Sequence, residues 1–445
     1  MNRFHSVILD EESCKGCTVC VTTCPTEAIR VRNGKARITS ERCIDCGECI
    51  RRCPHHAKKP MADSFSAFPA AWRDRFDLLV ALPAPSLYGQ FPAKFSLDHI
   101  HRGLLALGFD AVFPVAAATP DISLATRRLI AERKADGAAG PLISSSCPTI
   151  VKYAQIRFPT LIDNLATVIA PMERAGRMVK EAAPRSVGCF FISPCAGKIT
   201  EAIAPIAQER SSVDAVFPMS DVYLPLLQAM IRNAKASGDD AAEASLPPFA
   251  ARDQGAAEIS WGRSGGEADT ALGADSGRAL SVDGMDQCVK ILEAAEDGKL
   301  VGIDFLELMA CPGGCTGGPL TACNTALARH HLRERERTLA AAARPEIPPP
   351  SIAERPDVDC LRAKPFPARP ALRLNPDFSA AMAMMQRMDE IRAALPGLDC
   401  GCCGAPNCQA LAEDIVRGTG SKSDCVIIMK EEYRELLEQR WQSLE

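Results

Sequence analysis

The stretch SVGCFFISPCAGKITEA, residues 186–202, joins an apolar run typical of a buried β-strand to a loop that carries a cysteine. Other short apolar runs, such as FDLLVALPAP and DAVFPM, alternate with helical segments such as LDHIHRGLLALGF across residues 75–331. This alternation of strands and helices is typical of an α/β fold, in which helices cover a parallel sheet. The sequence therefore predicts a parallel α/β domain over residues 75–331.

Three loops of this region place cysteines after apolar segments. The four cysteines are Cys147 in LISSSCPTI, Cys195 in FISPCAGKITEA, and Cys311 and Cys315 in ELMACPGGCTGG. Because the carboxyl ends of parallel strands open into one crevice, side chains from distant loops can meet there. We therefore expect these cysteines to hold one metal cluster. The proline and two glycines between Cys311 and Cys315 would let the backbone approach it closely.

The composition fits a globular chain that is unusually rich in cysteine. Its 445 residues are 47 % hydrophobic and 24 % charged, and the formal net charge is −4. We find no long basic run, signal peptide or apolar span of about 18 residues, so neither nucleic acid nor a membrane is a predicted partner. These features predict a cytoplasmic protein. Because that compartment keeps thiols reduced, most of the 21 cysteines are expected to be metal ligands rather than disulfides.

Residues 1–60 contain two copies of the motif C-x2-C-x2-C-x3-C-P. In bacterial ferredoxins, the first three cysteines of each copy bind one [4Fe-4S] cluster and the fourth binds the cluster of the other copy. The predicted ligands are therefore Cys14, Cys17, Cys20 and Cys53 for one cluster, and Cys43, Cys46, Cys49 and Cys24 for the other. A pair of zinc sites is the alternative, but two interlocked copies that both end in proline favour iron. An Asn-Gly turn between the copies predicts a β-hairpin in this electron-carrying module.

A third cysteine motif lies in the predicted domain of residues 386–445. Its spacing, C-x2-C-x4-C-x16-C, is similar to that of a small four-iron module of electron-transfer proteins, with zinc as the alternative. The candidate ligands are Cys400, Cys403, Cys408 and Cys425. The final segment, CVIIMKEEYRELLEQRWQSLE, is predicted to form an amphipathic helix that serves as a packing or homodimer face. The remaining thiols are expected to be buried packing residues, namely Cys189, Cys288, Cys323, Cys360 and Cys402.

Two segments have compositions that favour connecting or surface structure. Residues 332–385 are rich in proline, arginine and alanine without sustained apolar periodicity, which predicts an extended linker. Residues 236–277 are rich in alanine, glycine, aspartate and serine, which predicts a surface insertion.

The three cysteine loops resemble the signature motifs of the [FeFe]-hydrogenases over roughly residues 78–320. The matching residues are Cys147 and Pro148 in the first motif, Pro194, Cys195, Lys198 and Glu201 in the second, and Glu307, Met309, Cys311, Gly314 and Cys315 in the third. The segment WGRSGGEADTAL, inside the predicted insertion, also resembles a glycine-rich segment of that family near its active site.

The resemblance implies an H-cluster, which is a [4Fe-4S] cubane joined to a two-iron centre with CO, cyanide and a dithiolate bridge. The four cysteines of the three loops would hold the cubane, and Cys315 would also bridge to the two-iron centre. Lys198 would donate a charge-assisted hydrogen bond to a cyanide. Glu307 and Met309 would contact the two-iron part.

The resemblance has gaps where the family moves protons. Ser146 replaces the cysteine that usually precedes the first ligand, and a hydroxyl is a far weaker acid than a thiol. A serine of the family's proton relay corresponds to Ala170, and the segment DISLATRRL offers no acid beyond Asp121. These losses resemble the divergent, sensory branch of the family. They predict a hydrogenase-type oxidoreductase with low turnover, in which Ser146 occupies the position of proton exchange.

Two classes of function follow from the sequence. The first is a hydrogenase-type protein that binds H2 at a six-iron H-cluster, as a sensor or a slow hydrogenase, with electrons relayed by [4Fe-4S] clusters. The second is a non-enzymatic iron-sulfur scaffold or electron carrier that lacks the two-iron centre. Lys198, Glu307 and Met309 favour the first class, because they would contact only the two-iron part. No kinase or DNA-binding motif is visible, so a sensor would need a separate redox or signalling protein as its partner.

Overall fold

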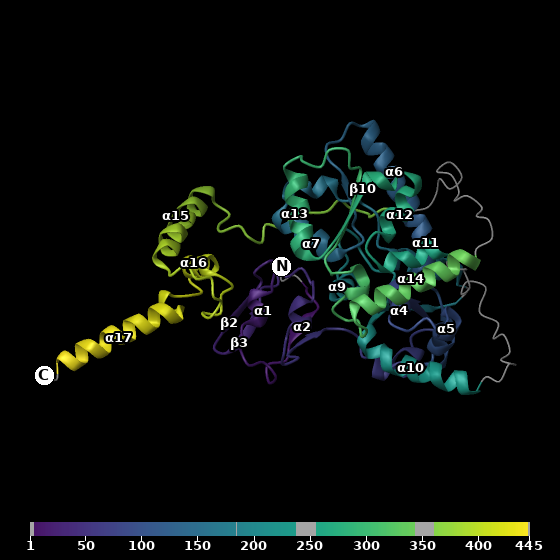
Figure 1. Cartoon of the computed structure of the whole chain (residues 1–445), viewed down its shortest axis with the longest axis horizontal. Helices are drawn as coiled ribbons and strands as arrows, with labels where there is room; N and C mark the ends of the chain where they lie inside the picture. The colour runs from purple at the N-terminus through teal and green to yellow at the C-terminus, as the bar shows by residue number, and fades with distance from the viewer. Residues whose placement is uncertain (1–3, 184, 237–254, 343–359, 444–445) are drawn as a thin grey trace. The chain divides into compact units, whose positions relative to one another are not determined.

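The computed structural model describes residues 4–183, 185–236, 255–342 and 360–443 (Figure 1). The chain divides into two compact units. The larger unit comprises Ile44–Gly47 and Pro60–Ala368, and the smaller unit comprises Met1–Cys43, Glu48–Lys59 and Arg369–Glu445. Four residues of the second N-terminal cysteine motif are therefore grouped with the larger unit.

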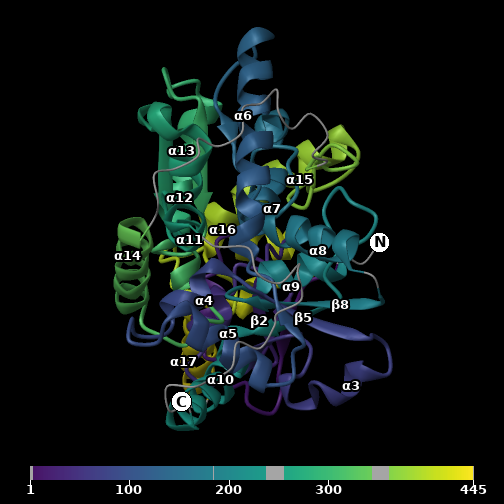
Figure 2. The same ribbon diagram turned by 90° about the vertical axis from the view of Figure 1, so that its right-hand side faces the viewer.

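A four-stranded parallel sheet lies in the larger unit, with the strand order β6-β5-β8-β9. Its strands are β5 (Leu78–Pro83), β6 (Ala111–Val112), β8 (Val187–Ser193) and β9 (Ala215–Pro218). Every residue of β8 is buried, as expected for a parallel strand that is covered on both faces. Figure 2 shows α8 (Pro171–Ala182) on one side of these strands and α10 (Met219–Ala236) on the other. The prediction of a parallel α/β fold is confirmed.

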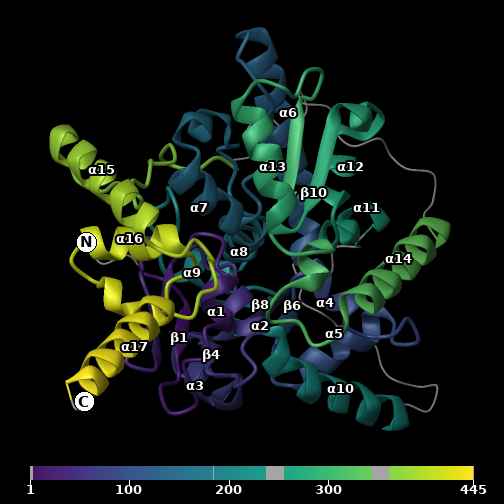
Figure 3. The same cartoon turned by 60° about the vertical axis from the view of Figure 1, so that its left-hand side comes forward.

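A second parallel sheet has three strands in the order β10-β11-β7. These strands are β7 (Leu142–Ile143), β10 (Ala279–Asp283) and β11 (Phe305–Met309). The sheet contacts α12 (Gly266–Leu272) and α13 (Met285–Glu296), which lie on opposite sides of β10 in Figures 1 and 3. Each cysteine loop of the larger unit follows a strand of one of the two sheets. Strand β8 precedes Cys195, β7 precedes Cys147, and β11 precedes Cys311.

The smaller unit contains the hairpin of β2 (Ile29–Arg32) and β3 (Lys35–Ile38). The turn residues Asn33 and Gly34 have positive φ angles of 52° and 72°, as an Asn-Gly hairpin turn requires. Helices α15 (Phe378–Ala394) and α16 (Cys408–Val416) pack against each other in the same unit. The predicted hairpin is therefore present, together with the C-terminal cysteine motif.

Within the smaller unit, the N-terminal hairpin contacts the C-terminal cysteine module directly. Asp414 of α16 accepts hydrogen bonds from Arg30 Nε at 2.8 Å and from Arg32 Nη2 at 2.6 Å. The Val31 amide donates a 2.8 Å hydrogen bond to the Gly404 carbonyl oxygen. The sequence predicts separate domains at the two ends of the chain, whereas these contacts join them into one unit.

The predicted linker over residues 332–385 is wrong in its described parts. Helix α14 (Thr325–Ala342) continues through the start of this segment, because LRERERTLAAA consists mostly of strong helix formers. Helix α15 begins at Phe378, before the predicted end of the linker, and Cys360 is fully buried in a core cluster of the larger unit. Residues 343–359 of the predicted linker lie outside the described residues.

The predicted insertion over residues 236–277 is partly packed. Its residues 237–254 lie outside the described residues. The next segment forms α11 (Ala256–Ile259) and α12. Trp261, between these helices, and Glu267, within α12, are both buried. Among the described helices, none is long and apolar enough to span a membrane.

Candidate functional site

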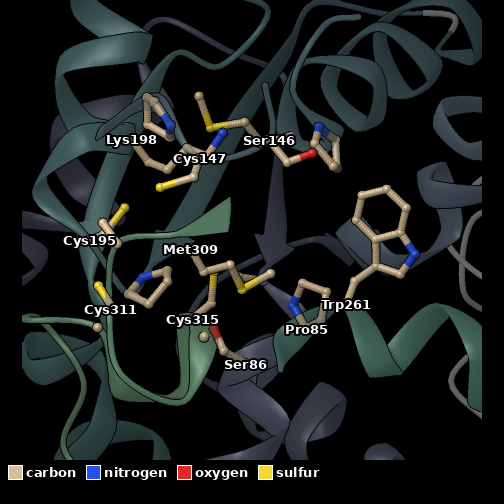
Figure 4. A pocket seen from close by; sticks show the side chains of 18 of the residues that line it. Pro85, Ser86, Ser146, Cys147, Cys195, Lys198, Trp261, Met309, Cys311 and Cys315 are labelled. Carbon is tan, nitrogen blue, oxygen red and sulfur yellow. The ribbon is translucent and has the colours of Figure 1, made fainter. Parts of the chain in front are cut away.

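Three loops of the larger unit meet around one pocket, which Figure 4 shows from close by. Its lining includes all four predicted cubane ligands, Cys147, Cys195, Cys311 and Cys315. Cys147 directly precedes α7 (Pro148–Arg157), and Cys195 directly precedes α9 (Ala196–Ile203). The other two cysteines follow β11. The structure therefore brings together ligands that lie up to 168 residues apart in the sequence, from Cys147 to Cys315.

The glycines between Cys311 and Cys315 let this loop pass close to a neighbouring segment of the protein. Gly313 and Gly314 have positive φ angles of 82° and 77°, which L side chains rarely adopt. A Cβ atom on Gly314 would lie 2.6 Å from the backbone nitrogen of Ser264. The spacer thus allows two backbone segments to meet beside the pocket.

The donor set and its burial fit an iron-sulfur cluster. Burial raises the pKa of the Cys195 thiol to about 11, and it also raises the pKa of Cys315. The thiolates that bind iron are therefore disfavoured at neutral pH unless positive charge stabilises them. Lys198 lines the pocket and lowers both pKa values in part. The irons of a cluster would supply the rest of the positive charge.

Met309 lines the pocket as predicted, whereas Glu307 lies behind it. Both residues belong to β11, but Glu307 is two positions, or about 7 Å, farther from the cysteine loop. The Glu307 carboxylate accepts hydrogen bonds from the amides of Gly265 and Ala268, each at 2.9 Å. Glu307 is not among the described residues that line the pocket, and its contact with a two-iron centre stays a prediction.

The pocket also presents a carboxyl group that the sequence analysis does not single out. Glu267 lines the pocket with Ser146 and is 3 % exposed. Both Glu267 oxygens lie 2.8 Å from Ser144 Oγ, and Ser146, which also lines the pocket, is close enough to lower the pKa of this carboxyl group. The signal that could have found Glu267 is its position within WGRSGGEADTAL, the stretch that resembles a glycine-rich segment of the family.

The environment of Glu267 favours its neutral, protonated form. Burial and the charge of Glu307 raise the pKa of Glu267 to about 8, although Ser144 and Ser146 lower it in part. Burial also raises the pKa of Glu307, to about 7. A carboxyl group with such a pKa can accept and donate a proton near neutral pH. The pocket therefore holds a carboxyl group of raised pKa beside Ser146.

The other residues considered for a proton relay lie away from the pocket lining. Ala170 is fully buried and directly precedes α8. Asp121 is also buried, and its carboxylate lies 2.9 Å from Arg174 Nε. Among the described residues that line the pocket, Glu267 is the one acidic side chain.

A loop of the second N-terminal cysteine motif reaches the same pocket from within the larger unit. Cys46 is among the lining residues. The neighbouring Asp45 forms a buried ion pair with Lys152, at 2.5 Å. Lys152 lies on α7, the helix that begins directly after Cys147. This ion pair holds the loop that carries Cys46 beside the helix that follows Cys147.

The predicted ferredoxin ligands of the smaller unit are also brought together. One cavity is lined by Cys14, Cys17, Cys20 and Cys53, so the fourth member comes from the second motif as predicted. The amides of Ala28 and Ala57 donate hydrogen bonds to the sulfurs of Cys24 and Cys53, at 3.2 and 3.3 Å. Such bonds stabilise thiolates. In the second predicted ligand set, Cys24, Cys43 and Cys49 belong to the smaller unit and Cys46 to the larger one.

The C-terminal motif is arranged around a small core of the smaller unit. Cys403, Cys408 and Cys425 belong to one hydrophobic cluster with residues of α15 and α16. Cys400 is exposed, and its charge contributes to raising the pKa of Cys403. Cys408 is the first residue of α16, so three of the four predicted ligands pack together near this helix.

The five unassigned thiols have different environments. Three are fully buried as predicted, namely Cys189, Cys288 and Cys360. Cys323 is half-buried. Cys402 is exposed beside Cys400, so the expectation that it is a packing residue is wrong.

Comparison with protein families supports the assignment of all three cysteine regions. Residues 77–319, more than half of the chain, match the family described as the iron-only hydrogenase large subunit, C-terminal domain. Residues 6–54 match a 4Fe-4S dicluster domain. Residues 395–427 match the family described as "Putative Fe-S cluster".

Several curated proteins have similar sequences, among them two hydrogenases and an assembly factor. The periplasmic [Fe] hydrogenase large subunit of Nitratidesulfovibrio vulgaris is 26 % identical, over 71 % of this chain and 86 % of that protein. Iron hydrogenase 1 of Clostridium pasteurianum is 24 % identical over 54 % of this chain. The match covers about half of that relative's length, 49 %. The cytosolic Fe-S cluster assembly factor NAR1 of Eremothecium gossypii is 31 % identical, over 31 % of this chain and 32 % of that protein.

The fold also has a counterpart among solved structures. A cysteine-to-histidine variant of apo [FeFe]-hydrogenase HydA1 from Chlamydomonas reinhardtii matches with a TM-score of 0.50 and 17 % identity. The match covers 68 % of this chain and 97 % of that one. At this identity the likeness establishes the fold of the larger unit.

Proposed function

This chain belongs to the family of iron-only hydrogenase large subunits, and on that premise we propose that it binds H2 at a six-iron H-cluster in the pocket of the larger unit. The observation that carries the proposal is the convergence of the four predicted cubane ligands with Lys198 around that pocket. When bound, the H-cluster would supply the chemistry that interconverts H2 with protons and electrons. The residues of the chain hold this cofactor, orient it and move the protons.

Lys198 is placed to hold an anionic part of the cofactor. Its Nζ atom lies 2.8 Å from Glu201 Oε2, and its side chain is 12 % exposed. Burial alone would lower the pKa of Lys198, but Glu201 raises it above its ordinary value. The ammonium group therefore stays charged at neutral pH, and it can donate a hydrogen bond to a cyanide ligand of the two-iron centre.

In this proposal, Glu267 replaces the proton relay that the sequence lacks. A proton released in the pocket passes to the Glu267 carboxylate by way of the Ser146 hydroxyl. Glu307, whose charge acts on Glu267, shares the proton and accepts a hydrogen bond from Ser281 Oγ at 3.3 Å. Ser281 is half-buried on β10 and leads toward solvent. A hydroxyl at the first step makes the path slow, because it exchanges protons less readily than a thiol.

We therefore assign the protein a role as an H2 sensor or a slow hydrogenase whose electrons leave through the [4Fe-4S] clusters. Helix α17 (Val426–Gln442) exposes Met429, Tyr433, Leu436 and Trp441, which offer an apolar face to a redox or signalling protein or to a second copy of the chain. The cytoplasmic location stays a prediction from the cysteine content, and one relative is named as a periplasmic protein.

A second candidate function is a non-enzymatic iron-sulfur scaffold. The similarity to a protein named as an Fe-S cluster assembly factor and the serine at position 146 favour it. In that case the pocket would hold the cubane without a two-iron centre, and Lys198 would have no cyanide to bind.

Exposure of the matured protein to H2 tests the first candidate against the second. We expect H2, but not argon, to reduce the [4Fe-4S] clusters, as measured by electron paramagnetic resonance. The matched control is Cys315→Ser, which should abolish the response to H2 while dithionite still reduces the N-terminal clusters. Wild-type clusters that dithionite reduces but H2 does not would contradict the proposal and favour the scaffold.

Replacement of Ser146 by cysteine should raise the rate of H2 evolution modestly, by about tenfold. The thiol has a pKa near 8.5 and exchanges protons better than the hydroxyl, while Glu267 and the rest of the path stay unchanged. The measurement is H2 evolution at equal cofactor loading, with Ser146→Ala as the control, which should be slower than wild type. Equal rates for all three proteins would show that protons do not pass through this position.

A further inference from the structure

A segment predicted to be linker returns to the larger unit beside the pocket, and we call residues 360–368 the strap. The Cys360 carbonyl oxygen accepts a 2.8 Å hydrogen bond from the amide of Ile169. The Arg362 amide donates a 2.8 Å hydrogen bond to the Thr167 carbonyl oxygen, and Leu361 forms an antiparallel bridge in between. The strap is therefore paired with the segment that leads into α8, rather than extended between domains.

Arg362 anchors the strap through a side chain that is only 1 % exposed. Its Nε and Nη1 atoms donate hydrogen bonds to the carbonyl oxygens of Val168 and Ile206, at 3.0 and 2.6 Å. Its Nη2 atom donates a hydrogen bond to Glu201 Oε1 at 3.0 Å. The guanidinium carbon also lies 5.1 Å from the ring centre of Phe366, in the same strap. Because all three nitrogens have partners in fixed directions, the guanidinium is held in one orientation.

Glu201 connects Arg362 to the pocket. Its second oxygen, Oε2, accepts the 2.8 Å hydrogen bond from Lys198, which lines the pocket. The Glu201 side chain is fully buried. Burial alone would raise the pKa of Glu201, but Lys198 and Arg362 lower it to about 2. The carboxylate is therefore ionised and shared between two cations.

The charges of this triad do not cancel. Lys198 and Arg362 carry two positive charges and Glu201 carries one negative charge, whereas Lys198 and Glu201 alone would form a neutral pair. Another buried carboxylate, Glu173, also acts on Lys198, but it accepts hydrogen bonds from Ser211 and from the Ser212 amide, and burial raises its pKa toward the neutral form. A buried excess of positive charge is costly unless an anion offsets it. Lys198 is the member of the triad that lines the pocket, where the Cys195 thiolate also acts on it, so the offsetting negative charge belongs to the group that the cysteines hold there and to its ligands.

We propose that Arg362 is a positioning residue of the pocket, which holds Glu201 so that the Lys198 ammonium is fixed and its positive charge remains available to an anionic ligand. The identity of that anion as a cyanide of the two-iron centre rests on the proposed function. The net positive charge of the triad does not rest on it, because that charge follows from the contacts among Lys198, Glu201 and Arg362. The strap thus contributes to the site although none of its residues lines the pocket.

Binding of the two-iron part to full-length protein that carries its cubanes tests this proposal. The probe is the dianionic two-iron complex with two cyanide ligands. We expect Arg362→Gln to weaken its uptake by about 10- to 100-fold, the range that a hydrogen bond to a charged group contributes, and to shift the cyanide infrared bands. Arg362→Lys keeps the charge but loses the fork of donors, so its effect should be smaller. If Arg362→Gln does not fold, Arg362→Lys takes its place in the test.

The matched control is Lys364→Gln, which removes a positive charge from the same strap where the side chain is 64 % exposed. It should leave uptake and the cyanide bands as in wild type. Wild-type uptake and band positions in Arg362→Gln would overturn the proposal. If the wild type itself takes up no two-iron complex, the proposed function fails. In that case, binding of free cyanide to the cubane-only protein still tests the role of Arg362. Cyanide should bind about tenfold more weakly to Arg362→Gln than to wild type. Equal binding to the two proteins would overturn the proposal.

Discussion

Replacement of Glu267 by glutamine is expected to lower the rate of H2 evolution by about 100-fold at neutral pH, which is typical of the loss of a positioned acid or base. Glutamine has nearly the same size and can keep a hydrogen bond with Ser144, but it does not exchange a proton. The clusters should assemble as in wild type, because Glu267 is not a ligand. The measurement is H2 evolution at equal iron content per protein.

The dependence of this rate on pH provides a sharper test. The pKa of Glu267 is raised to about 8, so the carboxyl group carries a proton below that pH and loses it above. Wild-type H2 evolution should therefore decline as the pH rises through about 8, and Glu267→Gln should lack this decline. The matched control is Asp286→Asn, at an exposed position on α13, which should keep the wild-type profile. A glutamine variant with the wild-type rate and profile would mean that protons use another route.

Replacement of Asp414 by alanine is expected to lower the free energy of unfolding of the smaller unit by roughly 2–4 kcal/mol. The change leaves Arg30 and Arg32 without their shared carboxylate, and the loss stays below that of a fully enclosed ion pair because Arg32 is 26 % exposed. Since Asp414 joins the two ends of the chain, the variant should disturb the N-terminal clusters as well as the C-terminal one. Chemical denaturation followed by cluster absorbance measures the first effect, and electron paramagnetic resonance measures the second.

The control for this variant is Glu11→Ala, which breaks the 3.5 Å ion pair with Arg37 on the same hairpin. Both side chains of that pair are more than half exposed, so the unfolding free energy should change by less than about 1 kcal/mol. If Asp414→Ala altered the C-terminal cluster alone, the two ends of the chain would be independent modules, as the sequence predicts.

The cysteine ligands could be predicted because the information for each motif is local. Cys14, Cys17 and Cys20 lie within seven residues, and the spacing alone restricts the metal that they can bind. Strand-like runs before Cys147 and Cys195 place those residues at the carboxyl ends of parallel strands, where distant loops meet. The parallel α/β fold and the convergence of the three loops follow from these two features.

Glu267 and Arg362 could not be predicted in the same way, because their roles depend on contacts between distant segments. The pKa of Glu267 is raised only because the fold buries its carboxyl group and places Glu307 near it. Arg362 lies 161 residues after Glu201, in a proline-rich stretch whose composition favours a linker. The local sequence around a single arginine in such a stretch does not indicate that it pairs with a distant buried carboxylate. Likewise, helix α14 was not predicted after His331 because it has no long apolar stripe there. It is stabilised by the helix propensity of its residues and by a few buried residues such as Leu332.

We propose that the pocket around Cys147, Cys195, Cys311 and Cys315 holds a six-iron H-cluster. Infrared spectroscopy of protein matured with the two-iron cofactor tests it most directly, because bound CO and cyanide absorb where the polypeptide does not. We predict sharp CO and cyanide bands that change under H2 and are absent from Cys315→Ser. A spectrum without these bands, from protein whose cubanes are fully assembled, would contradict the claim.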